Sequence, residues 1–589
     1  MVNIKINGIN IQVDDNITIL DAAKKIGIKI PTLCYHEDLR PSGNCGLCVV
    51  ELKGGKMVRA CSTPVAEGMD IQTQSPTLLS ARKTVLELIL SNHPNNCLEC
   101  IKNRKCELQK VAYEMNIKDI PYNKILRPVV EKDTSSNAII LSPAYCIQCG
   151  RCVEVCQVVQ NVHALEYSER GFNTFVGPTM GRKLEESECV KCGQCSSVCP
   201  VGAIYEKDDS DKVWEALSNP DLILVAQEAP AVRVAIGEEF GLPIGTNVVK
   251  KMYTALRRMG FKYVFDTNFG ADLTICEEAA EFAEWFLKYP EKLPLITTCC
   301  PSWVDYLEKF FYDLIPHFSS AKSPHQMLGA MVKTYWAKKM EIPKEKIFLV
   351  SIMPCTAKKY EIDRIDDMYS SGTKDVNATI TTREFGRMLK EAGIDLPSLP
   401  ESDADNPLGE YSGAGTIFGA SGGVMEAALR TAYYYITGKE LENPDIKFVR
   451  GMNGIKEGEL EILGKKIKIA VASGLSNVEI ILNRIRDAKR EGKPTPYHFI
   501  EVMACRGGCV GGGGQPYGST IKVREERAKG LYDEDFKLKY RQSHNNPSIK
   551  KIYEEFLEKP NSHKAHKYLH THYVPRPLYK GEHDSDWIG

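Results

Sequence analysis

The chain has 589 residues, of which 43% are apolar, and its 75 basic residues nearly balance its 76 acidic residues. A net charge of −1 provides no global field that would favour nucleic acid or an anionic lipid surface. The length predicts several domains, because single cores rarely grow beyond about 250–300 residues.

The N-terminal sequence predicts neither export nor a membrane anchor. MVNIKINGINIQV alternates apolar and polar residues like a strand, and it lacks the basic and apolar segments of a signal peptide. No apolar run approaches the roughly 20 residues that span a bilayer. We therefore expect a cytoplasmic protein with no membrane segment and no nucleic-acid partner.

Residues 1–78 are predicted to form a small mixed sheet with one helix. Val2–Ile6 and Ile9–Val13 flank an Asn-Gly dipeptide, which is typical of a two-residue hairpin turn. A helix is expected over Thr18–Ile26, with Thr18 as its N-cap. This pattern resembles the β-grasp fold of ferredoxins.

The pattern changes twice further along the chain. Helical sequence is expected from Pro76 to residue 130, followed by two cysteine-rich turns separated by a short strand. The acidic, polar segment EKDDSDKVWEALSNPD predicts a linker. From Leu222 onward, strand-like runs (LILVAQ, KIFLVSIM, KIKIAVASG, YHFIEVMA) alternate with helical stretches, and a charged, mostly helical tail begins near Asp533. This predicts a large α/β domain with substantial parallel sheet.

The 21 cysteines are grouped rather than scattered. Disulfide frameworks are typical of small secreted domains in an oxidising compartment, whereas this chain is large and groups its cysteines in CxxC motifs. Reduced thiolates that bind metal clusters fit better. The order of the groups indicates an electron wire that leads to a reaction centre.

Two of the groups share the spacing of two-cluster ferredoxins. CIQCGRCVEVC reads C-x2-C-x2-C-x3-C, and CVKCGQCSSVCP repeats it with a trailing proline. Zinc is disfavoured, because zinc ribbons usually pair one CxxC with a distant CxxC. In two-cluster ferredoxins the fourth cysteine of each run ligates the other cluster. The predicted [4Fe–4S] ligand sets are Cys146, Cys149, Cys152 and Cys199 for one cluster and Cys189, Cys192, Cys195 and Cys156 for the other.

The first group departs from the plant-type spacing C-x4-C-x2-C, because it reads C-x10-C-x2-C-x12-C. Four cysteines within a β-grasp pattern still favour one [2Fe–2S] cluster. The spacing resembles the N-terminal cluster domain shared by the large iron–sulfur subunit of complex I and certain hydrogenases. The predicted ligands are Cys34, Cys45, Cys48 and Cys61.

The second group, HPNNCLECIKNRKC, has only three cysteines. Alone, His93 would be interpreted as a surface or capping residue. Its position four residues before a C-x2-C-x5-C motif that lacks a fourth thiolate favours a ligand instead, and imidazole generally raises the potential of such a cluster. Both families just named carry this site, so a third relay [4Fe–4S] cluster is expected on His93, Cys97, Cys100 and Cys106.

Three further segments identify the reaction: TTCCPSW, MPCTAKKYE and EVMACRGGCVGGGGQP. In this order and at these separations they resemble the signature segments of [FeFe] hydrogenases, and the resemblance, to the multi-cluster clostridial type, covers essentially the whole chain. It implies four domains, with the catalytic cofactor between the lobes of the last. These are a [2Fe–2S] β-grasp domain (1–78), a helical one-His/three-Cys domain (79–130), a two-[4Fe–4S] ferredoxin-like domain (131–208) and an α/β catalytic domain (209–589).

The resemblance implies a catalytic H-cluster, which is a [4Fe–4S] cubane linked to a two-iron subsite carrying CO, cyanide and an azadithiolate. By this resemblance the cubane ligands are Cys300, Cys355, Cys505 and Cys509, the last of which also bridges to the two-iron unit. Cys299 corresponds to the family's proton-relay thiol. A thiol with an unperturbed pKa of about 8.5 can carry protons near neutrality.

Other cofactor contacts follow from the same resemblance. Lys358 is expected to donate to a cyanide, because an ammonium offers three donors and a positive charge; elsewhere it would be interpreted as a solvated lysine. Met353 and Met503 fit as packing around the cofactor, although methionine is more often core filler. Pro230 and Ala231 lie in a family segment that often has Ser in place of Ala231, so a hydroxyl hydrogen bond is expected to be missing here.

The proton route is expected on an acidic helix. GADLTICEEAAEF places Glu278 and Glu281 three residues apart on one face, and Ser319 completes the family's path outward from Cys299. A solvated acidic face is the alternative interpretation. The family's outer arginine is absent, with Trp285 near its place, so the exit to solvent is left open. Cys276 is expected to be structural.

The predicted reaction is reversible proton reduction, 2H⁺ + 2e⁻ ⇌ H2. An electron-transfer subunit like that of complex I is disfavoured, because a relay needs no adjacent cysteine pair, and sensory relatives typically lose the relay cysteine. A stand-alone, ferredoxin-dependent enzyme remains an alternative to a subunit of a larger complex.

Expectations about partners come from the tail and from missing motifs. No flavin or nicotinamide fingerprint is evident, so NAD(H) chemistry would require another subunit, and ferredoxin is the generic partner. HKAHKYLHTHYVPR resembles the end of the catalytic subunit of electron-bifurcating hydrogenases, which implies flavin- and NAD(H)-binding and iron–sulfur partner subunits. His563, His566 and His570 share a helical face there and are either a metal site or ordinary tail residues. Maturases are expected to supply the two-iron unit.

Overall fold

The first hairpin forms as predicted. Strands β1 (Val2–Ile6) and β2 (Ile9–Val13) pair antiparallel in a computed structural model that describes residues 1–123 and 131–578. Asn7 and Gly8 both have positive φ, at 49° and 86°, as a two-residue hairpin turn requires.

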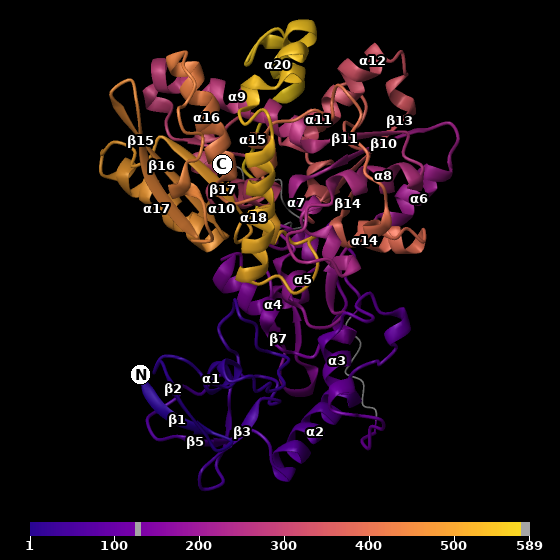
Figure 1. The fold of residues 1–589 in the computed structure, drawn as a ribbon, viewed down its shortest axis with the longest axis vertical. Helices are drawn as coiled ribbons and strands as arrows, with labels where there is room; N and C mark the ends of the chain where they lie inside the picture. The colour runs from indigo at the N-terminus through magenta and orange to yellow at the C-terminus, as the bar shows by residue number, and fades with distance from the viewer. Residues whose placement is uncertain (124–130, 579–589) are drawn as a thin grey trace.

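A mixed sheet and one helix complete the N-terminal domain at the bottom of Figure 1. Helix α1 (Ile19–Lys25) begins at Thr18, whose hydroxyl caps the Asp21 N–H in a capping box. The strand order is β2-β1-β5-β3-β4, and β1 and β5 are parallel. The remaining strands are β3 (Val49–Leu52), β4 (Met57–Arg59) and β5 (Asp70–Gln72).

The cysteine-rich middle of the chain is only partly helical. Helix α2 (Pro76–Ser91) begins at the expected proline and α3 (Glu107–Glu114) follows, but the chain between them consists largely of turns. The last part of the expected helical stretch, 124–130, lies outside the described residues. The other regular elements here are β6 (Ile139–Leu141) paired with β9 (Ile204–Glu206), the hairpin β7 (Glu166–Ser168) and β8 (Phe175–Gly177), α4 (Arg151–Glu154) and α5 (Gln194–Val198).

The predicted linker is wrong. Residues of that segment form α6 (Ser210–Ser218), which buries Val213 and Ala216 in a hydrophobic core of the catalytic domain. The segment's Glu206 is also buried and pairs with Arg383 at 2.7 Å. The high density of charged residues suggested a solvated linker, but apolar residues three apart give the helix one buried face.

Two four-stranded sheets form the two lobes of the upper part of Figure 1. In the first, β11 (Tyr263–Asp266), β10 (Ile223–Glu228), β13 (Ile347–Met353) and β14 (Ala378–Thr381) are all parallel. In the second, β12 (Leu295–Ile296), β17 (Phe499–Met503) and β16 (Lys465–Ser473) are parallel, and β15 (Ile455–Ile462) pairs antiparallel at the edge. The predicted strand-like runs thus fall in two sheets.

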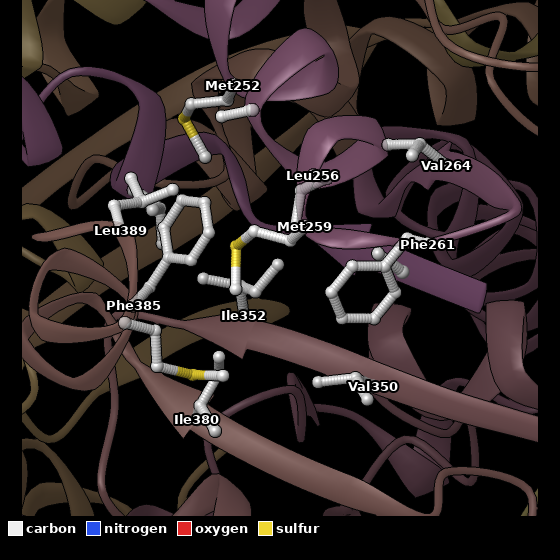
Figure 2. Close-up of a cluster of buried hydrophobic side chains, with 14 of the residues drawn as sticks. Met252, Leu256, Met259, Phe261, Val264, Val350, Ile352, Ile380, Phe385 and Leu389 are labelled. Atoms are coloured by element: carbon white, nitrogen blue, oxygen red, sulfur yellow. The ribbon is translucent and has the colours of Figure 1, made fainter. Parts of the chain in front are cut away.

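Helices cover both sheets and join them. Figure 2 shows how Met252 and Leu256 of α8 (Val249–Met259) and Phe385 of α14 (Thr382–Glu391) pack toward Ile352 and Ile380 of the first sheet. The long helix α9 (Thr267–Lys288) contributes to the cores of both lobes.

The remaining α-helices complete the two lobes. They are α7 (Pro230–Arg233), α10 (Pro301–Phe310), α11 (Pro324–Met331), α12 (Ala337–Lys339), α13 (Lys358–Glu361), α14 (Thr382–Glu391), α15 (Gly413–Ile417), α16 (Gly423–Thr437), α17 (Leu475–Arg490), α18 (Ile521–Lys537), α19 (Pro547–Ile552) and α20 (His563–Leu569). Within residues 1–123 and 131–578, none of the helices combines the length and apolar character needed to cross a bilayer.

Candidate functional site

A cavity of about 520 Å³ of atom-free space lies where strands of both sheets end. Cys299 and Cys300 follow β12, Cys355 follows β13 and Cys505 follows β17, so parallel strands deliver these side chains from their carboxyl ends. The cavity is lined by the predicted site residues Cys299, Cys355, Cys509, Lys358, Met353, Met503, Pro230 and Ala231.

The four predicted cubane cysteines interact electrostatically with one another, and two of them, Cys355 and Cys509, line this cavity. Burial is the main cause that raises the pKa of each thiol, to about 12 for Cys355, and the neighbouring thiols Cys300, Cys355 and Cys509 raise that of Cys505 further. Four buried thiolates without a cation would be strongly unfavourable, and iron supplies the compensating charge. The donor set therefore fits an iron–sulfur cubane.

Cys299 is not the unperturbed thiol that we expected. It is buried, and burial followed by the neighbouring Glu278 carboxylate raises its pKa well above the ordinary value. A low-dielectric surrounding disfavours the thiolate, so the resting group is a protonated thiol. It lines the cavity beside the predicted cubane cysteines, where a proton-bearing group is needed.

Lys358 belongs to a buried ion-pair network whose other members, Glu361 and His325, were not predicted from the sequence. Lys358 Nζ donates to the Cys299 carbonyl at 3.1 Å and to Glu361 Oε2 at 2.6 Å, which uses two of its three donors. His325 Nε2 lies 2.6 Å from the same carboxylate oxygen, and burial lowers the pKa of this histidine to about 4.

Several residues that line the cavity were not predicted as site residues from the sequence. His325, Phe418, Thr267 and Ala271 also line the cavity, although they lie far apart in the chain. Only Phe418 falls within a glycine-rich segment that invites attention. Their common role becomes visible once α9, α11 and the cysteine loops are packed together.

Glu278 and Glu281 of the predicted proton path lie on α9, and Ser319 contacts Glu281 from another segment. Burial, and then the charge of Glu281, raises the pKa of Glu278 to about 8, so this carboxyl is protonated at neutral pH. Ser319 donates to Glu281 Oε2 at 2.9 Å. Both glutamates are buried, which contradicts the alternative interpretation as a solvated acidic face. Cys276, from the same helix, is packed in a hydrophobic core as expected for a structural residue.

The tail histidines do not form a metal site. No group of three or more His, Cys, Asp or Glu among the described residues is arranged to hold a single metal ion. His563 and His566 are exposed, but His570 is buried and is therefore not an ordinary tail residue.

The two ferredoxin-like cysteine sets each surround a separate cavity. Cys146, Cys149, Cys152 and Cys199 line one of about 430 Å³ of atom-free space. Cys156, Cys189, Cys192 and Cys195 line another of about 420 Å³. The fourth cysteine of each run thus reaches the other run's cavity, in the arrangement predicted from the spacing. Thiols around a cavity, rather than converging on one point, fit a multi-iron cluster better than zinc.

The four N-terminal cysteines converge more tightly. Cys48 Sγ and Cys61 Sγ lie 3.3 Å apart, and Cys34 interacts with both Cys45 and Cys61. All 21 cysteines are free thiols, so no disulfide competes for them. The compact donor set fits a smaller cluster.

His93 lies just beyond the end of α2, before the turn that carries Cys97. Its ring is buried, and Nδ1 is in hydrogen-bond contact with the Asn95 side chain at 3.1 Å. With Nδ1 engaged and the ring held in place, coordination through Nε2 is the arrangement that fits a ligand role.

Close contacts connect the four relay sites with one another and with the loop that follows Cys509. Ser42, near Cys45, donates to the Cys149 carbonyl at 3.1 Å, and a Cβ on Gly202 would lie 2.5 Å from Cys100 Sγ. At the other end, a Cβ on Gly513 would lie 2.2 Å from the Cys192 carbonyl oxygen. Glycine at 202 and 513 therefore permits approaches that any side chain would block.

Family models match the whole succession of modules. They are described as a 2Fe-2S iron-sulfur cluster binding domain (1–76), the NADH-ubiquinone oxidoreductase-G iron-sulfur binding region (82–121) and a 4Fe-4S dicluster domain (145–203). The next two are the iron only hydrogenase large subunit, C-terminal domain (222–513), and the iron hydrogenase small subunit (521–576).

Relatives match over nearly the full length. The chain is 45% identical to NADP-reducing hydrogenase subunit HndD of Solidesulfovibrio fructosivorans, over 98% of this chain and 99% of that protein. It is 39% identical to iron hydrogenase 1 of Clostridium pasteurianum, over 97% of this chain and 100% of the relative. Among solved structures, apo [FeFe]-hydrogenase HydA1 from Chlamydomonas reinhardtii is 42% identical with a TM-score of 0.55, covering 62% of this chain and 99% of that one.

Proposed function

The chain belongs to the iron-only hydrogenase family and is an [FeFe] hydrogenase with an N-terminal iron–sulfur relay, and from this premise we propose how its residues divide the reaction. The reaction is 2H⁺ + 2e⁻ ⇌ H2. The observation that carries the assignment of roles is the cavity that Cys299 and Lys358 line together with two of the predicted cubane cysteines, Cys355 and Cys509. A relay subunit would need neither residue.

We propose that Cys300, Cys355, Cys505 and Cys509 hold the cubane, with Cys509 also bridging to a two-iron subsite that carries CO, cyanide and azadithiolate. When bound, this group supplies the open iron position at which hydrogen is made or split. Lys358, with one donor left after its bonds to Cys299 and Glu361, is placed to donate to a cyanide. The methionines and Pro230–Ala231 shape the apolar wall and exclude water.

Protons are proposed to reach the cavity through Cys299. The thiol, Glu278, Ser319 and Glu281 form a buried succession of groups that can each hold or pass a proton. Because Glu278 is protonated at neutral pH, it can act as a donor toward the cavity. Glu278 itself then carries no charge in the interior.

Electrons are proposed to pass through one [2Fe–2S] and three [4Fe–4S] clusters in domains divided at residues 78, 130 and 208. The first two sites both contact the segments that carry Cys146, Cys149, Cys152 and Cys199, and the second ferredoxin-like set contacts the loop that follows Cys509. The relay therefore has two outer branches and one inner end. Two branches suit an enzyme that exchanges electrons with more than one partner.

We further propose that the chain is the catalytic subunit of a cytoplasmic, electron-bifurcating complex that links hydrogen to NAD(H) and ferredoxin. The full-length similarity to a subunit of an NADP-reducing hydrogenase supports a multisubunit enzyme. The similarity to iron hydrogenase 1 supports the alternative, a stand-alone ferredoxin-dependent enzyme. Dedicated maturases would supply the two-iron subsite in either case.

One anaerobic purification from the native host distinguishes these proposals. Hydrogen evolution from a reduced viologen dye tests the hydrogenase reaction alone. Co-elution of flavoprotein and iron–sulfur subunits, with hydrogen evolution that needs NADH and reduced ferredoxin together, is expected for the bifurcating complex. A single-subunit preparation that is fully active with ferredoxin alone would contradict it.

A further inference from the structure

The C-terminal segment is fixed against the chain that carries Ser319. The Thr571 N–H donates to the Ser320 carbonyl at 2.8 Å, and the Lys322 N–H donates to the Leu569 carbonyl at 2.8 Å. Ala321 and His570 form an antiparallel bridge. His570 is therefore held by backbone pairing beside the outer end of the predicted proton path.

Both ring nitrogens of His570 have partners. Nδ1 lies 2.8 Å from Ser320 Oγ, and Nε2 lies 3.0 Å from Glu277 Oε2. Glu277 also accepts a hydrogen bond from the Tyr553 hydroxyl. A carboxylate on Nε2 favours the tautomer with the proton on that nitrogen and leaves Nδ1 to exchange a proton with Ser320.

Ser320 continues the path from Glu281. Its hydroxyl donates to Glu281 Oε1 at 3.3 Å, and its N–H donates to Oε2 at 3.3 Å. Oε2 also accepts the hydrogen bond from Ser319. Ser319, Glu281, Ser320 and His570 thus form one unbroken run of side chains in hydrogen-bond contact.

His566 brings this run to the surface. Its ring centroid lies 3.9 Å from that of His570, one helical turn away, and its side chain is exposed. Burial and the adjacent His570 lower the pKa of His566. The other charged groups around the pair are Glu277, Glu281, Glu284 and His563. An exposed imidazole is suited to collecting protons from solvent.

We propose that His570 and His566 are the outer end of the proton route and take the place that the sequence left without an arginine. In the inward direction, the exposed His566 takes up a proton from solvent, and the proton moves on to His570, whose ring lies against it. His570 Nδ1–H then gives its proton to Ser320 Oγ while the Ser320 hydroxyl gives its own proton to Glu281. One proton moves inward and each hydroxyl and imidazole returns to its starting composition. This inference rests on the proposed role of Glu278 and Glu281.

The test measures proton exchange without hydrogenase turnover. In protein produced without the two-iron subsite, the protonated Glu278 carboxyl gives an infrared C=O band that shifts in D2O, and Glu278→Gln identifies that band. After rapid dilution into D2O, His570→Gln is expected to slow the shift about 10²-fold, the lower end of the range by which a positioned acid–base group accelerates transfer. His566→Ala is expected to slow it about threefold or more.

His544→Gln is the matched control, because His544 is also buried and has partners on both ring nitrogens, Thr431 and Glu440, outside the path. Its exchange should equal that of the wild type. Smaller effects of His570→Gln than stated, or an equal effect of the control, overturn the proposal. If His570→Gln does not fold, the exposed His566→Ala decides alone.

A second measurement separates this inference from the proposed function. In the loaded enzyme, His570→Gln should lower kcat for hydrogen evolution, leave KM for the electron donor unchanged, and recover in part with added imidazole. If the loaded wild type were inactive, the proposed function would fail while the exchange result would still stand. If the wild type were active and exchange unaffected by either variant, only the histidine exit would fail.

Discussion

The side-chain amide of Gln194 donates a hydrogen bond to Cys505 Sγ at 3.2 Å. Gln194 lies beside Cys192 and Cys195 in the second ferredoxin-like run, whereas Cys505 lies at the end of β17 in the catalytic domain. The same amide also donates to the Gly511 carbonyl at 2.9 Å. One side chain therefore connects the last relay site to a proposed ligand of the catalytic cubane.

Gln194→Leu should lower the reduction potential of the cubane. A hydrogen bond to a ligating sulfur stabilises the reduced, more negative cluster, so its loss favours the oxidised form. Redox titration followed by electron paramagnetic resonance, in protein lacking the two-iron subsite, measures the change. Gln109→Leu is a control, because its side chain lies near the Cys106 site instead. An unchanged cubane potential would refute this role of Gln194.

Cys299→Ser should retain the clusters and lose about 10²–10⁴-fold in hydrogen evolution, because a hydroxyl is a far weaker acid than a thiol. Iron content and cluster spectra should match the wild type. Cys276→Ser is the control, since Cys276 is also a buried cysteine but lies in a hydrophobic core. Near-normal turnover by Cys299→Ser with intact spectra would remove Cys299 from the proton route.

Glu278→Gln should change how stability depends on pH. Burial raises the pKa of Glu278 to about 8, whereas an unfolded glutamate titrates near 4.3. Between these values the folded state holds a proton that the unfolded chain has released, so the free energy of unfolding falls as pH rises. At about 1.4 kcal/mol per pH unit, this term costs a few kcal/mol at alkaline pH.

The glutamine variant lacks that term. Its thermal midpoint should therefore exceed that of the wild type at pH 9, and the two should converge near pH 4. Thermal unfolding followed by circular dichroism across this range provides the measurement. Parallel pH profiles for the two proteins would show that Glu278 titrates normally.

Lys358→Met should prevent stable binding of the two-iron subsite while the cubane remains. The ammonium is buried, its pKa is held above the ordinary value by Glu361 against the cost of burial, and its third donor is available to the cavity. Infrared bands of CO and cyanide should be lost after maturation, with cubane spectra intact. Full retention of those bands would show that the lysine serves only the network with Glu361 and His325.

Crossed ligation of the relay clusters predicts non-additive losses of iron. Cys199→Ala and the double variant with Cys146→Ala should lose the same single cluster, because both cysteines line one cavity. Cys199→Ala with Cys189→Ala should lose two clusters, because Cys189 lines the other cavity. Iron analysis and cluster spectra distinguish the cases. The opposite pattern would mean that each run holds its own cluster.

The sequence by itself determined the modules and the chemistry. Thiolates must be close together to share a cluster, so the short spacings around Cys146 and Cys189 specify their sites locally, and the Asn-Gly turn and the Thr18 cap do the same for the first hairpin and helix. The segments around Cys300, Cys355 and Cys505 indicated the reaction because their residue types and order are distinctive.

Only the tertiary structure decided what depends on neighbours distant in the chain. The charged stretch around Val213, predicted as a linker, is a packed helix. The pKa of Cys299 is raised because the thiol is buried, which the spacing of the cysteines does not reveal, and burial disfavours the thiolate. The tertiary structure also brought His570 to Ser320 across 250 positions of sequence. Hydrogen bonds and desolvation act over a few ångströms of space, and the fold alone sets which residues share that space.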